Sequence, residues 1–180
     1  MEEKLKKHRL KNRFLRIERK VNKYITKIER GYISKFSNKF LIIQESDDFE
    51  FKGFSIFKLN TIISLRFNKY DKFYDEIMKS ECVKINIDNK GSINIDNWNS
   101  IFNSLSKDGR HVIIECEKPK DDLFIIGKII NVNKKSVDVK YFDAAGVWDK
   151  KLTKVRYKQI TKILFHDRYI DVMSKYLKPE

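Results

Sequence analysis

Basic side chains carry the most evident chemistry of this chain. Its 39 Lys and Arg against 25 Asp and Glu give a formal net charge of +14. Residues 1–30 hold seven Lys and five Arg against four Glu, a net +8, so one sixth of the chain supplies over half of the charge. Five of the nine arginines lie in this segment, and the guanidinium group suits two-pronged contacts with phosphate. The clustering predicts a phosphate-binding surface near the N-terminus.

Seven basic residues are the candidate contacts, five of them in the N-terminal segment and two in a turn of the second half. They are Lys7, Arg9, Lys11, Arg13, Arg16, Lys134 and Lys135. Such side chains bind nucleic-acid phosphates largely without reading the base sequence, so RNA or single-stranded nucleic acid is one expected partner. An acidic protein is the other, because positive charge also steers protein association. In that case the chain would be a protein-binding module of the inhibitor, immunity or host-takeover type.

Other residues with chemical potential lack the spacing that catalysis or metal binding needs. His8, His111 and His166 have no His or Cys neighbour at metal-ligand spacing. The pair His166-Asp167 could form half of an acid–base pair, but it directly follows a strand, where polar turn residues are common. The chain also has no glycine-rich phosphate loop, nucleophile elbow or paired CxxC motif. We therefore expect no catalytic residue, no metal and no cofactor, hence a binding protein that is not an enzyme.

The cysteines and the start of the chain indicate a cellular compartment. Cys82 and Cys116 lie far apart in strand-like surroundings, which favours two reduced core thiols over a disulfide or metal pair. The start, MEEKLKKHRLKNR, has no apolar region of the kind that a signal peptide contains. No run of about 18 apolar residues is present, as a membrane-spanning helix would need. We expect a soluble, cytoplasmic protein with no membrane partner.

An internal repeat organises the elements around these residues. Gly31 opens GYISKFSNKFLIIQ and Gly127 opens GKIINVNKKSVDVK, each a glycine in an apolar strand, then a turn, then an alternating strand. Gly53 before FSIF and Gly146 before VW form a second pair. The offsets are 96 and 93 residues, and a near-constant offset favours an internal duplication.

Each half then continues in the same way. The apolar strand IISLRF at 62–67 matches ITKILF at 160–165, and short helices are predicted after them at 72–78 and 168–173. First strands are predicted at 14–19 and 112–117 from β-branched and aromatic residues.

One further helix is predicted at residues 97–107, ahead of the strands of the second half. Its apolar residues recur at i, i+3, i+4 and i+7, which is typical of a helix with one buried face, and Asp96 is the expected N-cap. The stripe consists of Trp98, Ile101, Phe102 and Leu105. Most other aromatic residues alternate with polar ones and are predicted to be core. The exception is FEFKGF at 49–54, where some rings are expected to be exposed.

These elements predict a mainly β, α+β fold of two tandem small five-stranded barrels, each flanked by short helices. Glycines inside strands permit the sharp bends that such barrels require. The first unit with its basic N-terminal segment would span residues 1–80, a hairpin or extended linker 81–95, and the second unit 96–180.

This order resembles the Sm/Lsm-like small barrel. The resemblance depends on the strand glycines with their following turns, at 31–40 and 127–136, and on the short joints KLNTI and RYKQI. The RNA-binding signatures of that family are absent, so the resemblance implies the fold alone. SH3-like and OB-like barrels would give nearly the same pattern. Small barrels often assemble edge to edge, which leaves homo-oligomerisation open.

Overall fold

The computed structural model describes residues 1–81, 93–109 and 111–179. The chain divides into two units, Met1–Lys90 and Gly91–Glu180. Both are mainly β with short helices, which confirms the predicted α+β class. The hairpin or linker expected at 81–95 falls mostly outside the described residues. In the part that is described, no helix has the length and apolarity to cross a membrane.

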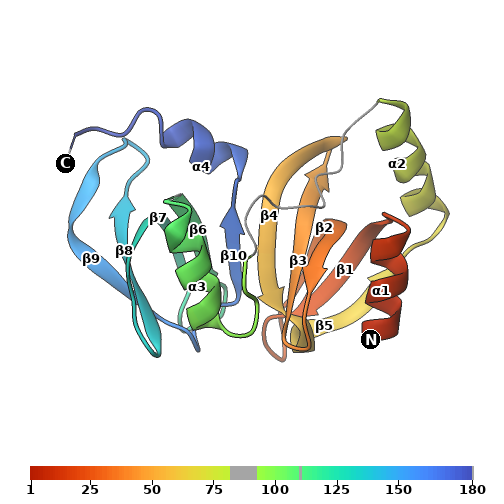
Figure 1. The fold of residues 1–180 in the computed structure, drawn as a ribbon, viewed down its shortest axis with the longest axis horizontal. Coiled ribbons are helices and arrows are strands. Elements are labelled where there is room, and N and C mark those ends of the chain that lie inside the picture. The colour runs from red at the N-terminus through yellow and green to blue at the C-terminus, as the bar shows by residue number, and fades with distance from the viewer. Residues whose placement is uncertain (82–92, 110, 180) are drawn as a thin grey trace. The chain divides into compact units, whose positions relative to one another are not determined.

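The first unit is an antiparallel sheet with two helices (Figure 1). Its strands follow the order β5-β1-β2-β3-β4, and a 3₁₀ turn at Leu59–Thr61 joins β4 to β5. The elements are α1 (Glu2–Leu10), β1 (Phe14–Lys20), β2 (Thr26–Phe36), β3 (Phe40–Asp47), β4 (Glu50–Lys58), β5 (Ile62–Arg66) and α2 (Lys69–Ser80).

The two helices of this unit are held by different contacts. In α1 the only buried side chain is Leu5, which joins a core cluster with Leu15 and Ile17 of β1. Because α1 has a single apolar anchor, its lysines and arginine stay in solvent. Helix α2 packs on β1 through Met78, which contacts the cluster around Phe14. The predicted helix 72–78 is thus confirmed.

The second unit repeats the pattern of an antiparallel sheet with helices (Figure 1). Its strands follow the order β10-β6-β7-β8-β9. The elements are α3 (Trp98–Lys107), β6 (His111–Cys116), β7 (Leu123–Val132), β8 (Ser136–Phe142), β9 (Trp148–Arg156), β10 (Lys162–Phe165) and α4 (Arg168–Met173).

Helix α3 lies over β7 and β8 of its own unit. All four residues of the predicted stripe are buried, and Ile101 and Phe102 have no exposed surface. The N-cap is Asn97 and not Asp96, because the Asn97 side chain accepts the hydrogen bond from the Ser100 amide at 2.9 Å. The cap prediction was therefore wrong by one residue.

The repeated glycines behave differently in the two pairs. Gly31 in β2 and Gly127 in β7 each lie against a neighbouring backbone carbonyl that a Cβ would overlap, and each precedes a register shift by two residues. These two positions correspond. Gly53 lies inside β4 opposite Glu45, whereas Gly146 lies in the turn before β9, so the second pairing is wrong. The internal duplication stays a prediction.

The strands form open antiparallel sheet and not the two closed barrels that the sequence predicted. A barrel closes only when its two edge strands pair. Among the described strands, β5 does not pair with β4, and β9 does not pair with β10. The resemblance to the Sm/Lsm-like barrel is therefore overturned. Alternation and strand glycines specify strands and bends, but they carry no information on whether distant edges meet.

Cys116 is a fully buried free thiol at the end of β6. Burial raises its pKa to about 11, and the carboxylates of Asp121 and Glu117 add to the shift. Only the thiolate reacts as a nucleophile, and at pH 8 Cys116 stays in the unreactive thiol form. In a Cys82→Ser variant, iodoacetamide at pH 8 should leave Cys116 unmodified in the folded protein and label it fully in denaturant. Rapid labelling of the folded variant, read by mass spectrometry, would contradict this burial.

Candidate nucleic-acid interface

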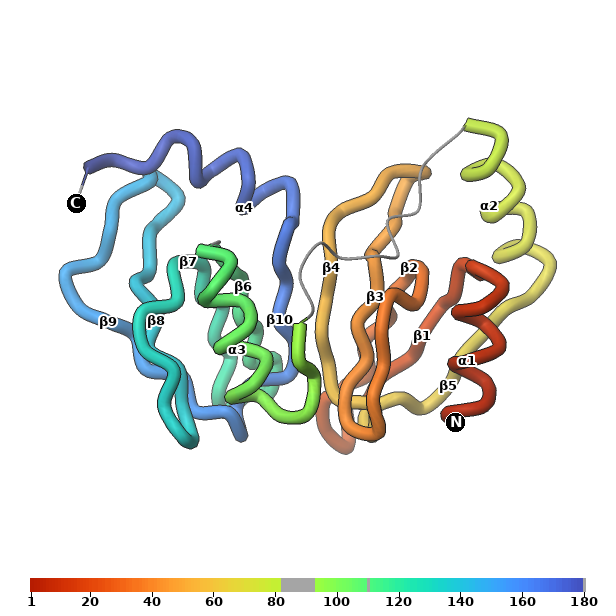
Figure 2. The backbone as a smooth tube through the Cα atoms, viewed as in Figure 1, coloured from red at the N-terminus to blue at the C-terminus, as the bar shows by residue number. Residues whose placement is uncertain are grey.

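Two of the seven predicted contact residues lie in the turn between β7 and β8. This turn comprises Asn133, Lys134 and Lys135, and both lysines are exposed. Figure 2 shows it at the same end of the unit as the segment that joins β9 to β10. Residues from both segments therefore contribute to one surface.

The turn is held by hydrogen bonds from several elements. The Asn133 carbonyl accepts from the Tyr157 hydroxyl at 2.8 Å and from the Asn99 side chain of α3 at 3.0 Å. The Tyr157 amide donates to the Lys135 carbonyl at 3.0 Å. Because these hydrogen bonds fix the backbone at both ends of the turn, ligand binding loses less conformational entropy there than on a mobile loop.

Strand β9 and the turn after it supply three more cations. Alternate strand residues share a face, which brings Lys154 and Arg156 to one side while Val155 between them is buried. Lys158 follows in the turn. Together with the β7–β8 turn they surround a cavity of about 640 Å³, here called the basic hollow. It is lined by Lys134, Lys135, Ser136, Lys154, Arg156, Tyr157 and Lys158.

The electrostatic character of the basic hollow is uniform. Five of its seven lining residues are cations, and among the described residues that line it none is acidic. The carboxylates nearby have other partners: Asp138 accepts from the side chains of Asn131 and Asn133, and Asp121 accepts from Gln159. Asp138 also lies opposite Lys154 in the register of β8 and β9. The five cations still leave an excess of positive charge around the cavity, which attracts a polyanion and suits phosphate.

The aromatic ring in the basic hollow rests on the core of the second unit. Tyr157 stacks on Phe102 of α3 with ring centroids 5.7 Å apart and an interplanar angle of 8°. Burial raises the pKa of Tyr157, so its hydroxyl stays protonated and keeps donating to Asn133. The ring is thus immobilised on one face while the rest of it lines the cavity.

The N-terminal candidates divide among three places in the first unit. Lys7 and Arg9 are exposed on α1, and Arg9 lines a cavity of about 560 Å³ with Lys6 and Phe36. None of the seven predicted residues forms an ion pair with another described residue. The charges of Lys7 and Arg9 on α1 are consequently available to a ligand.

Lys11 and Arg13 line a smaller cavity of about 310 Å³ together with Lys72 and Lys79 of α2. The charge there is mixed, because Asp75 and Glu76 also line it. Burial raises the pKa of Asp75, whose carboxylate accepts from the Phe14 amide at 2.9 Å.

Arg13 has a structural contact that Lys7, Arg9 and Lys11 lack. Its guanidinium lies 4.5 Å from the centre of the Phe67 ring, within cation–π distance. A substitution at Arg13 would therefore perturb packing as well as charge.

Arg16 is brought beside two arginines that the sequence did not connect with it. In the sheet register it pairs with Arg30 of β2 on one side and Arg66 of β5 on the other. Arg66 is neutralised by a two-pronged pair with Asp71, at 2.9 and 3.1 Å. Arg16 and Arg30 remain as like charges directly opposite one another, and an anion between them would relieve their repulsion.

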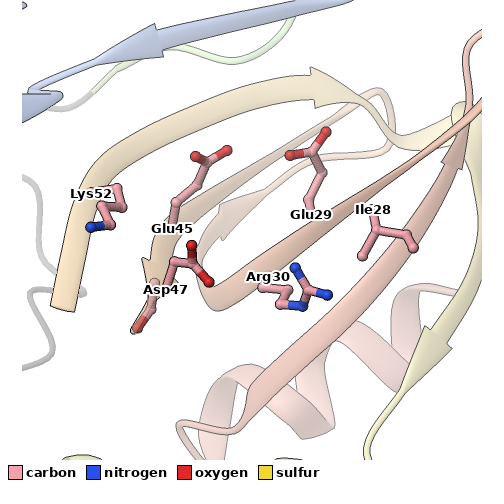
Figure 3. Close-up of a pocket in the computed structure, with 7 residues that line it drawn as sticks. Ile28, Glu29, Arg30, Glu45, Asp47 and Lys52 are labelled. Atoms are coloured by element: carbon pink, nitrogen blue, oxygen red, sulfur yellow. The ribbon is translucent and has the colours of Figure 1, made fainter. Parts of the chain in front are cut away.

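A pocket of mixed charge lies on the neighbouring strands of the first unit (Figure 3). It encloses about 190 Å³, and Glu29 and Glu45 extend from β2 and β3 into the same region. Glu29 is bound at 2.6 Å to Arg19, which is itself buried. The carboxylates would repel phosphate, so this pocket is a poor nucleic-acid site.

Sequence reasoning missed Lys154, Arg156, Tyr157 and Lys158. A signal was present: the cations in KVRYK recur at every second position, which places them on one face of a strand. Nothing in the sequence indicated that this face meets the turn carrying Lys134.

One member of the pair considered for catalysis has a structural role. Asp167 caps α4 by accepting from the Tyr169 amide at 2.8 Å. Within the described residues, no three His, Cys, Asp or Glu side chains gather closely enough to hold a metal ion. Comparisons with protein-family models, curated proteins and solved structures gave no match.

Proposed function

We propose that this protein is a non-enzymatic binding protein for RNA or single-stranded nucleic acid. The observation that carries the proposal is the basic hollow, where five cations surround one cavity and no described lining residue is acidic. Exposed Lys7 and Arg9 on α1 supply a second positive surface in the first unit.

The mechanism is electrostatic capture of phosphates. Lys and Arg displace the counterions that surround a nucleic acid, and release of these ions drives binding. Such contacts position the strand without reading its sequence. The fixed β7–β8 turn keeps Lys134 and Lys135 in place before the ligand arrives.

Salt dependence tests this function. Replacing Lys7, Arg9 and Lys11 by Gln should reduce the slope of log K against log salt by about two units, since each phosphate contact on a single strand contributes roughly 0.7. The melting temperature should hardly change, because exposed charges add little stability. The measurement is a salt titration of binding to a fluorescent oligonucleotide. A matched control carries Gln at Lys20, Lys27 and Lys39, which are also exposed in the first unit.

One result would exclude the proposed function, and another would exclude the α1 surface as its contact site. If the wild type fails to bind the oligonucleotide even at low salt, the nucleic-acid function is excluded and an acidic protein partner becomes the better explanation. If both triple variants flatten the slope equally, net charge and not the α1 surface determines binding.

A further inference from the structure

We propose that Tyr157 is a stacking platform for one unpaired base, held beside phosphates that the lysines of the basic hollow bind. This inference rests on the proposed function and adds a selectivity to it. Electrostatic capture alone does not distinguish a strand with bases from a bare sugar–phosphate chain. An aromatic platform does, because it gains energy only from a base.

The first support is the rigidity of the ring. Phe102 has no exposed surface and lies under Tyr157, nearly parallel to it, while the Asn133 carbonyl holds the hydroxyl at 2.8 Å. A ring fixed in this way loses little conformational entropy when a base covers it. Tyr157 is half-buried, and the surface that it retains lines the hollow.

The second support is the surrounding charge. Lys154, Arg156 and Lys158 flank the tyrosine in the chain, and Lys134 and Lys135 reach the same cavity from the opposite turn. A phosphate and its own base lie a few ångströms apart in a nucleotide, so cations and a platform in one cavity match this chemistry. Proteins that bind single strands without sequence preference combine these two features.

Two other exposed aromatic rings lack one of these features. Phe49 of the FEFKGF run also has a supporting ring, since it is stacked on Tyr74 of α2 with centroids 4.8 Å apart. It lacks the cations, because its chain neighbours are Asp48 and Glu50. Phe73 on α2 is exposed, but it lines none of the basic cavities described above. Tyr157 alone among these three has both a rigid support and a surrounding of cations.

The test compares two ligands of equal charge on the full chain. One is an oligothymidylate of about 12 nucleotides, within the usual site size of single-strand binders. The other is the abasic sugar–phosphate chain of the same length. The wild type should bind the first about tenfold more tightly, which corresponds to about 1.4 kcal/mol and falls within the range for one stacked base.

Variants assign this preference to the ring. Tyr157→Leu keeps an apolar side chain on Phe102 and should lose the preference. The preference is the ratio of the two affinities on the same variant, so any loosening of the β7–β8 turn by loss of the hydroxyl affects both ligands alike. Tyr157→Phe keeps the ring and should retain the preference. Phe73→Leu is the control for an exposed ring elsewhere and should also retain it.

The possible failures are distinguishable. Equal binding of both ligands by the wild type overturns the platform and leaves electrostatic capture intact, and this measurement needs no variant to fold. A preference that persists in Tyr157→Leu also overturns the platform. Absence of binding to either ligand overturns the proposed function itself.

Discussion

Replacement of Phe102 by alanine is expected to lower the free energy of unfolding by about 3–5 kcal/mol. The side chain has no exposed surface and lies between α3 and the turn after β9, with Trp98 and Tyr157 as ring neighbours. Truncation removes the transfer energy of the ring and leaves a cavity that the surrounding strands fill only in part. Urea unfolding followed by circular dichroism measures the change.

A control separates this effect from the general cost of removing a ring. Phe73→Ala on α2 deletes the same group from a side chain that is 63% exposed, and should cost about 0.5 kcal/mol or less. A loss below about 1 kcal/mol for Phe102→Ala would mean that α3 does not pack on β7 and β8 as observed. The Phe102 variant should also weaken oligonucleotide binding, because Tyr157 would lose its support.

Local patterns explain why parts of the fold were predictable. The apolar residues of α3 recur with the helical period on one face, so the burial of residues 98, 101, 102 and 105 could be predicted without knowing the rest of the fold. Helix α4 lies at Arg168–Met173, where a short helix was predicted after the apolar strand of the second half. Strands β1 and β6 likewise follow from β-branched and aromatic runs.

Features that depend on distant pairing were not predictable. The row of Arg16, Arg30 and Arg66 exists only because β1 lies between β2 and β5 in a particular register. Open edges in place of closed barrels follow from the same kind of long-range information. The alternation of polar and apolar residues in a single sequence predicts strands, but it does not predict the register between strands or whether a sheet closes into a barrel.

The candidate site combines both cases. Lys134 and Lys135 were predicted as turn lysines, and their exposure in the β7–β8 turn agrees with that position. Lys154, Arg156 and Lys158 showed a period of two, but the sequence did not reveal what brings them to the same cavity. The pairing of β9 with β8, which places Arg156 opposite Ser136, and the hydrogen bonds from Tyr157 to the turn do so. Counting charges along the sequence therefore placed most of the candidate contacts at the N-terminus, whereas the structure gathers the most cations around one cavity in the second unit.

The largest change in binding is expected from neutralising the basic hollow. Replacement of its four lysines by Gln should flatten the slope of log K against log salt by about three units, at roughly 0.7 per phosphate contact. A fourfold rise in salt should then weaken the wild type about 50-fold more than the variant. The substituted residues are Lys134, Lys135, Lys154 and Lys158.

A second variant with the same charge change identifies the source of this effect. It carries Gln at four lysines that are exposed in the second unit but do not line the hollow, namely Lys107, Lys120, Lys175 and Lys178. Both variants have a net charge lower by four, so long-range attraction falls by a similar amount in each. Contacts in the hollow are lost only in the first, whose slope should therefore change by at least two units more. Equal slopes in the two variants would show that total charge attracts the strand, and that these lysines make no phosphate contacts of their own.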